Sequence, residues 1–366
     1  MAEPLKNLLD AGIVLEIATY LGRNATAFDR ERFIALATLD LDSLELMQRS
    51  LRIRDALLQT LPEDFPAAAE ILRRALPGDD APGLNGWALL PVNQFIAARG
   101  LDDFELSLSL LRRLTPYFTA EFGIRAFIRQ DQQRALVIIS SWTSDNNHHV
   151  RRLASEGTRP RLPWAMRLPE LIRDPRPILP ILAALIDDPE DYVRRSVANS
   201  LNDIAKDHPD LVTRFVAAHV DGASPERLRL LRHACRTLLK QGHAEALANF
   251  GFGALSDIDA SLTLGTPLVR LGEHLRFGLE IRNSGAAAQK VMIDYAVHHQ
   301  KANGTTSPKV FKWTTVTLEP GAAFEIEKRH SIRPITTRRY YAGAHRVVVL
   351  INGQPVAGAD FELAID

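Results

Sequence analysis

DDPEDYVRRSVANSLNDIAKDHPDLV, residues 187 to 212, is the stretch that identifies the fold class. An Asp-Pro start precedes a first helix with a Val-Arg pair at Val193, and a second helix opens at Pro209. Related segments begin at Leu111, Val150 and Leu231, so that successive copies are separated by 39, 43 and 38 residues. These are intervals of HEAT-type helical pairs, which must stack because one pair cannot bury its apolar face alone. The sequence therefore predicts a helical solenoid.

The rest of the chain falls into two regimes. Residues 1–100 alternate apolar helical stretches with short breaks, with Asp29 expected as an N-cap. After Asp259 the apolar period becomes two, as in Leu275, Phe277 and Leu279, and Asn-Gly and Pro-Gly turns separate about seven strands. We predict an all-α HEAT-like repeat domain over residues 1–252 and an all-β immunoglobulin-like sandwich over residues 259–366.

Composition narrows the class of protein. The 366 residues exceed the usual size of one hydrophobic core, and the zero formal charge argues against a generally polycationic binder. The single cysteine, Cys235, excludes an internal disulfide and fits a reducing compartment. No apolar run reaches membrane-spanning length and no signal-peptide pattern is present, which predicts a cytoplasmic protein without a membrane partner.

A second stretch, DNNHHVRRLASEGTRPRLPW at residues 145 to 164, gathers side chains suited to nucleic acid. Guanidinium groups suit phosphate, an indole suits a flat or cationic ring, and a carboxylate suits developing positive charge. The side chains are Arg151, Arg152, Glu156, Arg159, Arg161 and Trp164. A structural alternative applies to the arginine pairs. Asp145 and Asp188 lie at equivalent repeat positions, where such Asp and Arg residues tie neighbouring units together.

Two carboxylates from adjacent repeats are expected on one concave patch. Glu156 occupies the repeat position of Asn199, and Asp203 lies one helical turn beyond Asn199 on the same face. The alternative for Asp203 is a solvated acid paired with Lys206. A third acid, Glu121, has as its own alternative a helix-surface ion pair with Arg125, one turn further along.

Three segments carry a family resemblance: FTAEFGIRAFI from Phe118, SSWTSDNNHHVRRLASEGTRPRLPW from Ser140, and the unit at Asp187. Together they resemble the HEAT-like-repeat alkylpurine DNA glycosylases, the AlkC and AlkD family, over about residues 1–250. The C-terminal sandwich makes the AlkC branch the closer match. The resemblance implies a monofunctional DNA repair glycosylase that hydrolyses the N-glycosidic bond of cationic alkylated bases, 3-methyladenine and in that branch also 3-methylcytosine.

The resemblance also implies site residues. It places Glu121, Glu156 and Asp203 as catalytic carboxylates that stabilise an oxocarbenium-like sugar and position water, with Trp164 holding the cationic base or the sugar. The resemblance assigns the phosphate contacts to Arg152, Arg159 and Arg161. Because a broad solenoid concavity offers no obvious pocket, the lesion is expected to be reached by distorting the backbone rather than by flipping the base into a tight pocket.

The sandwich has one unusual stretch, RHSIRPITTRRYYAGAHR at residues 329 to 346. Its Arg338, Arg339 and Tyr340 are candidates for DNA contact, the alternative being a packing module with a basic rim. No Cys or His cluster has zinc spacing and no glycine-rich phosphate loop occurs, so no cofactor is expected. The expected partner is damaged DNA bound by a monomer. A second class of function stays open, a noncatalytic HEAT-repeat adaptor that grips DNA or a protein.

Overall fold

The computed structural model describes residues 4–78, 81–336 and 338–365. The chain divides into two compact units, residues 1–207 and 208–366. Helices α13 to α16 lie in the second unit, whose first strand begins at Ile258. No helix in the described part of the chain is long and apolar enough to cross a membrane.

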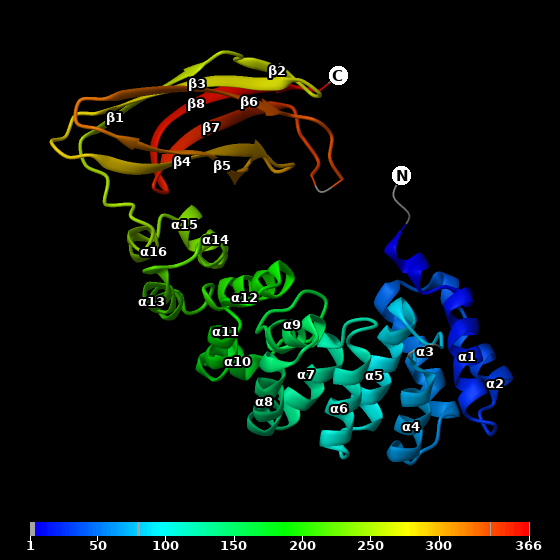
Figure 1. Ribbon diagram of the computed structural model, residues 1–366. Coiled ribbons are helices and arrows are strands. Elements are labelled where there is room, and N and C mark those ends of the chain that lie inside the picture. Colours follow the sequence, from blue (N-terminus) through cyan, green and yellow to red (C-terminus); the bar gives the residue numbers. More distant parts are fainter. Residues whose placement is uncertain (1–3, 79–80, 337, 366) are drawn as a thin grey trace. The chain divides into compact units, whose positions relative to one another are not determined.

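The first unit is an array of paired helices (Figure 1). The helices are α1 (Ala11–Asn24), α2 (Arg30–Thr38), α3 (Leu46–Thr60), α4 (Phe65–Ala75), α5 (Leu89–Arg99), α6 (Phe104–Leu114), α7 (Glu121–Gln130), α8 (Gln132–Ser141), α9 (His148–Glu156), α10 (Pro169–Arg173), α11 (Leu179–Ala184) and α12 (Asp191–Ile204). One row contains α3, α5 and α7 in contact, α4 contacts α6 behind it, and α12 packs on α9. The predicted N-cap is confirmed, since the Asp29 carboxylate accepts a hydrogen bond from the backbone N–H of Arg32.

Arginine–aspartate pairs tie successive repeats of this unit together. Arg112 pairs with Asp145, and Arg151 pairs with Asp188 one repeat later, with 2.6 Å between Nε and Oδ2. Arg151 also donates to the backbone carbonyl of Asp145, and Arg194 donates to that of Asp188. The same bonds recur at equivalent positions, which confirms the tying interpretation for the first arginine of these pairs. Arg152, the second arginine, points elsewhere.

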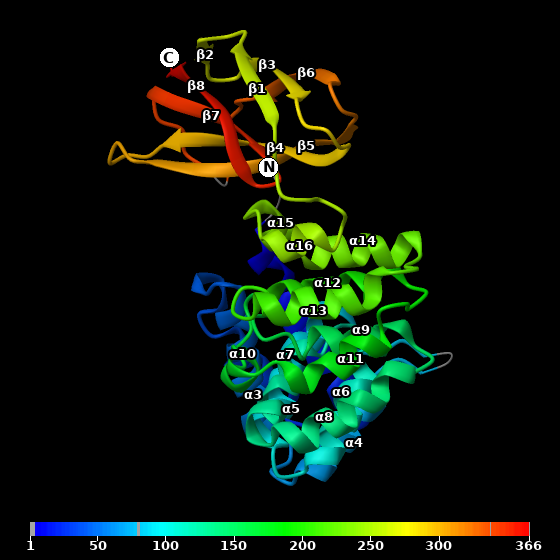
Figure 2. The same cartoon turned by 90° about the vertical axis from the view of Figure 1, so that its left-hand side faces the viewer.

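The second unit contains α13 (Pro209–Val220), α14 (Pro225–Ala234), α15 (Arg236–Lys240) and α16 (Ala244–Ala248), followed by eight strands. The strands are β1 (Ile258–Leu264), β2 (Leu268–Arg270), β3 (His274–Asn283), β4 (Gln289–Gln300), β5 (Thr306–Leu318), β6 (Ala323–Ser331), β7 (Gly343–Ile351) and β8 (Gln354–Ala364). One sheet has the order β1-β3-β6 and the other β2-β8-β7-β4-β5. Figure 2 shows the sheets as two layers, as predicted for a sandwich.

The strand periodicity read from the sequence matches the core of the sandwich. Leu275, Phe277, Leu279 and Ile281 of β3 are each at most 2% exposed. They point between the sheets, where they pack with buried side chains of β4, β7 and β8. The predicted turn at Asn352-Gly353 joins β7 to β8, with φ values of 48° and 76° that suit a tight hairpin.

Three contacts fix the short helices of the second unit to its sandwich. The Asn352 amide donates to the carbonyl of Gly253, and Lys290 Nζ donates to that of Phe250. Gly353 approaches Gly242 so closely that a Cβ added at Gly353 would lie 2.2 Å from the Cα of Gly242. The segment expected from the sequence to separate two domains, residues 252–259, therefore lies inside one compact unit.

Candidate active site

A hollow of about 580 Å³ opens in the first unit, within the size range of small-molecule sites. Its polar side chains include Glu121, Arg152, Glu156 and Arg159, and its aromatic lining includes Trp87, Phe118, Trp164 and Tyr192. The sequence predicted a broad concavity without an obvious pocket, and the structure has this hollow, lined by charged and aromatic side chains.

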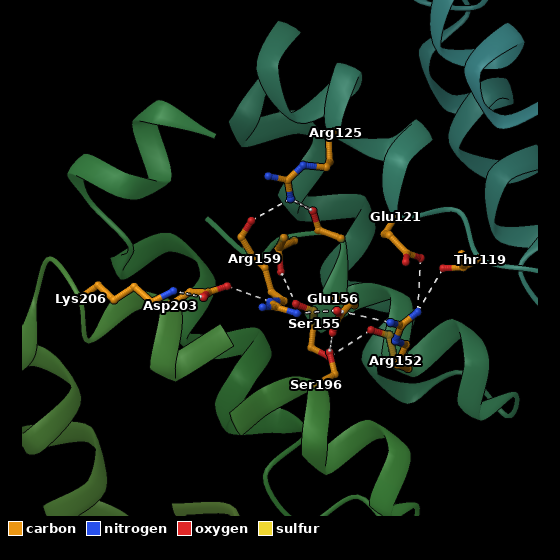
Figure 3. Close-up of polar contacts among 12 residues, drawn as sticks. Thr119, Glu121, Arg125, Arg152, Ser155, Glu156, Arg159, Ser196, Asp203 and Lys206 are labelled. Atoms are coloured by element: carbon orange, nitrogen blue, oxygen red, sulfur yellow. Dashed lines mark hydrogen bonds and ion pairs between the residues drawn. The ribbon is translucent and has the colours of Figure 1, made fainter. Parts of the chain in front are cut away.

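Helix ends bring the two glutamates to this hollow. Glu121 is the first residue of α7, and Glu156 is the last residue of α9. Gly157 follows at the point where α9 meets α7, and a Cβ added there would lie 2.1 Å from Ile124 Cδ1. Glycine thus permits the close approach of the two helices, and both carboxylates lie within reach of Arg152 (Figure 3).

The two glutamates share one arginine. Arg152 lies 3.3 Å from Glu121 Oε2 through Nη1 and 3.4 Å from Glu156 Oε1 through Nη2. Its guanidinium also sits 5.0 Å from the centroid of the Tyr192 ring, which comes from the first turn of α12. Arg152 therefore links carboxylates from two repeats while an aromatic ring from a third covers it.

A second arginine, Arg159, joins Glu156 to Asp203. Its Nη1 lies 2.6 Å from Glu156 Oε1, and its Nε lies 2.9 Å from Asp203 Oδ2. Lys206 Nζ completes the series at 3.0 Å from Asp203 Oδ1. Three cations thus alternate with three carboxylates, so the buried charges of the cluster are compensated.

The structure separates the three candidate acids. Glu121 and Glu156 line the hollow, whereas Asp203 is 2% exposed and is not among its lining residues. The pairing of Asp203 with Lys206 is present, but the acid is buried instead of solvated. The alternative pairing of Glu121 with Arg125 is wrong, because Arg125 is fully buried and donates to the backbone carbonyls of Gly157, Arg159 and Met166.

The three arginines predicted to contact phosphate differ in exposure and in their ion-pair partners. Arg159 is 7% exposed and its guanidinium pairs with carboxylates, so it lies deeper than a surface phosphate contact. Arg161 is more accessible and forms a two-point ion pair with Asp207 at 2.9 Å. Arg152 lines the hollow between the glutamates.

Burial sets the proton affinity of the cluster. Desolvation raises the pKa of Glu121 above its ordinary value, and the charge of Arg152 offsets only part of that effect. Burial lowers the pKa of Arg125 to about 10, although the carboxylates of the cluster act in the opposite direction. Glu121 therefore holds a proton more readily than an exposed glutamate.

Trp164 stands out by its backbone. It has a φ of 62°, a left-handed conformation that is uncommon and costly for a large side chain. Its indole is 67% exposed and lines the hollow. An exposed aromatic held in a strained conformation is typical of a side chain selected for binding.

Sequence reasoning missed several side chains of the site. Tyr192 covers Arg152, Ser196 bonds Glu156, and His149 lines the hollow. Tyr192 and Ser196 both lie in the repeat unit quoted first, at α12 positions directed toward α9. In the sequence, Tyr192 directly precedes Val193 and Ser196 directly follows the arginine pair after it. This position in the aligned repeat is the signal that could have indicated both residues.

The candidate DNA-binding side chains of the sandwich lie between β6 and β7. Arg338 Nη1 lies 2.6 Å from Nε2 of His299, a buried residue of β4. Burial, followed by the charge of Arg338, lowers the pKa of His299 to about 3, so its neutral ring accepts this hydrogen bond. Arg339 lies over the ring of Tyr341, and Tyr340 packs partly into the core.

Among the described residues, no group of three or more His, Cys, Asp or Glu side chains is arranged to hold a metal ion.

Comparison with known proteins gives two family matches. Residues 99–238 match the family described as DNA alkylation repair enzyme. Residues 259–365 match the family described as uncharacterised protein YhaZ, C-terminal Ig-like domain, which agrees with the predicted sandwich.

Two full-length relatives accompany these matches. YhaZ of Bacillus subtilis strain 168 is 37% identical over 361 residues, covering 98% of this chain and 99% of the relative. The Pseudomonas fluorescens alkylpurine DNA glycosylase AlkC, solved bound to DNA containing an abasic site analog, is 37% identical with a TM-score of 0.87. That similarity covers 99% of this chain and all of the other, so it includes both the helical and the β regions.

Proposed function

The chain belongs to the DNA alkylation repair enzyme family, as a full-length relative of the AlkC alkylpurine DNA glycosylase, and we propose that it excises cationic alkylated bases from DNA. The proposed substrates are 3-methyladenine and 3-methylcytosine in DNA. The observation that carries the proposal is the pair of carboxylates, Glu121 and Glu156, in a hollow with aromatic walls.

Hydrolysis of the N-glycosidic bond of such a base needs carboxylates of this kind. An N3-alkylated base already carries positive charge and leaves as a neutral molecule, so the reaction needs little help from a general acid. The sugar left behind develops oxocarbenium character, which a buried carboxylate stabilises, and water must then be directed to C1′. Water attack needs no lysine nucleophile, which makes the proposed enzyme monofunctional.

The two glutamates divide these tasks. Glu156 accepts hydrogen bonds from Arg159 and Ser196 and faces Arg152, so three donors surround its carboxylate. It is the proposed stabiliser of the sugar cation. Glu121, whose pKa is raised by burial, is a stronger base than an ordinary glutamate and is proposed to take the proton from attacking water. The pair therefore has distinct environments for distinct steps.

Asp203 takes a positioning role in this proposal. It lies outside the hollow and touches Arg159 and Lys206 instead of the space for substrate. Arg159 in turn contacts Glu156 through a different nitrogen. The charge of Asp203 thus orients Arg159, and Arg159 orients the catalytic carboxylate.

DNA affinity is assigned to accessible cations. Arg161, with Arg338 and Arg339 of the sandwich, is proposed to contact backbone phosphates, and Tyr340 to stack beside them. Arg152 would face the phosphates nearest the lesion, while the buried Arg159 holds Glu156. The exposure of Trp164 supports an open site in which the indole touches the lesion without a tight pocket closing around a flipped base.

Release of free methylated base from alkylated duplex DNA tests the function. The full chain is expected to release base, Glu156→Gln to release far less, and both to bind the DNA similarly, because the change keeps size and removes charge. DNA binding without base release by the unmodified chain would instead favour the noncatalytic adaptor.

A further inference from the structure

The two oxygens of the Glu156 carboxylate are held from different elements (Figure 3). Oε1 accepts from Arg159 Nη1 at 2.6 Å, within the segment that follows α9. Oε2 accepts from the hydroxyl of Ser196 at 2.7 Å, from the middle of α12. The carboxylate is therefore fixed across the junction of α9 and α12, and neither oxygen is free to rotate away without losing a bond.

The hydroxyl of Ser196 has only one proton to give. Ser155 Oγ lies 2.7 Å from Ser196 Oγ and 3.0 Å from the carbonyl of Arg152, so Ser155 can donate to either of them. Ser196 donates to Glu156 in both arrangements, because the ionised carboxylate can only accept. Ser155 and Ser196 are buried, so no bulk water competes for these bonds.

Packing alone does not account for a serine at this position. Ser200, one turn further along the same helix, is fully buried as well. Its hydroxyl has no hydrogen-bond partner among the described residues. Helix α12 therefore accommodates a buried serine whose hydroxyl bonds nothing, whereas the hydroxyl of Ser196 points at the carboxylate of the candidate site.

We infer that Ser196 is a positioning residue that holds the Glu156 carboxylate in the hollow. The inference rests on the proposed glycosylase function. Ser196 is not among the residues that line the hollow, so it acts through Glu156 and does not touch substrate. Its hydrogen bond selects one rotamer of Glu156, the last residue of α9.

Removal of this hydroxyl has one expected effect on the reaction. The rate of base release falls about tenfold to a hundredfold in Ser196→Ala, since small displacements of a catalytic group cost rate in this range. KM changes little because no contact with DNA is removed.

The experiment measures single-turnover release of methylated base from methylated duplex DNA by the full chain over a range of enzyme concentrations, with Ser196→Ala, Ser196→Thr and Ser200→Ala compared. Ser200→Ala is the matched control, since it makes the same change on the same helix without removing a hydrogen bond. Slow release with an unchanged KM in Ser196→Ala alone, with recovery in Ser196→Thr, supports the inference.

Two results overturn it. One is normal release by Ser196→Ala while Glu156→Gln is inactive, which leaves the proposed glycosylase function intact. The other is an equal loss in Ser196→Ala and Ser200→Ala, which assigns Ser196 to packing. Failure of the unmodified chain to release base would reject the proposed function itself, so the two failures are distinguishable.

Discussion

Arg159 Nε lies 2.9 Å from Asp203 Oδ2. The buried charge of Asp203 is therefore connected to Glu156 in the hollow by a single guanidinium. Both side chains are less than 10% exposed, and the pair is screened little by solvent or salt. A change at Asp203 is therefore expected to reach Glu156 through Arg159.

Asp203→Asn tests this connection. The amide keeps the shape of the side chain and an acceptor for Arg159, but it removes the buried negative charge. We expect base release to fall well below that of the unmodified chain and the free energy of unfolding to fall by about 1 to 3 kcal/mol. Calorimetry and base release measure the two effects, while DNA binding should change little. A parallel loss of DNA binding would contradict a positioning role.

The raised pKa of Glu121 predicts a pH dependence. A base must be ionised to accept a proton from water, so activity should be lost as pH falls through the raised pKa of Glu121, above the range of an exposed glutamate. The sign for stability is opposite. Because the folded chain binds this proton more tightly than the unfolded chain, the contribution of Glu121 to stability is present at low pH and lost as pH rises through the folded pKa.

Glu121→Gln separates those two effects. The variant should lose base release at every pH, because no base remains at this position. At neutral pH its Tm should equal or exceed that of the unmodified chain, since it no longer has to ionise a desolvated carboxyl group. A large drop in Tm at neutral pH would indicate that the ion pair with Arg152 outweighs desolvation.

Arg151 and Arg161 offer a comparison between tying residues and DNA contacts. The Arg151–Asp188 pair is mostly buried, so Arg151→Ala should lower the free energy of unfolding by about 2 to 4 kcal/mol and leave the salt dependence of DNA binding unchanged. The more exposed pair of Arg161 predicts the reverse, with a stability loss under about 1 kcal/mol and a shallower salt dependence. Identical salt slopes for both variants would remove Arg161 from the DNA interface.

Repeat spacing explains why the sequence predicted part of the site. Glu156 and Asp203 lie on helices, where alignment of the repeats indicates which face each residue occupies, whereas Glu121 was implied by the family resemblance. Arg159 follows the end of α9 at Glu156, so helical spacing does not apply to it, and the direction of its side chain is set by contacts with α12. Tyr192 reaches Arg152 across a repeat junction, a contact that spacing within one helix cannot indicate.

The sequence did not predict the division into compact units, for a similar reason. The change from helical to strand periodicity near residue 259 locates the sandwich correctly. The attachment of the preceding helices depends on Gly242 meeting Gly353, two residues far apart in the chain. Periodicity reports the type of element, whereas such a contact depends on how a hairpin and a helix end come together in space.

Gly353→Ala tests that attachment. The residue has a φ of 76°, and an added Cβ would lie 2.2 Å from the Cα of Gly242. Gly304 has the same φ of 76° with nothing within 4 Å of an added Cβ, so Gly304→Ala measures the backbone strain alone. We expect about 1 to 2 kcal/mol for Gly304→Ala and at least about 2 kcal/mol more for Gly353→Ala in denaturant unfolding of the full chain. Equal losses would show that the two backbones can separate at little cost.

Trp164 gives the last prediction. Because its indole is 67% exposed, Trp164→Ala removes little packing and should leave Tm nearly unchanged. If the indole holds the cationic base or sugar, the rate of base release should fall about twofold to thirtyfold, which corresponds to the cation–π attraction of about 0.5 to 2 kcal/mol. Trp164→Phe should recover part of that loss because an aromatic face remains. Val137, 70% exposed on α8, provides the control, and Val137→Ala should change neither quantity. Full activity in Trp164→Ala would leave the left-handed backbone at this position without a role in binding.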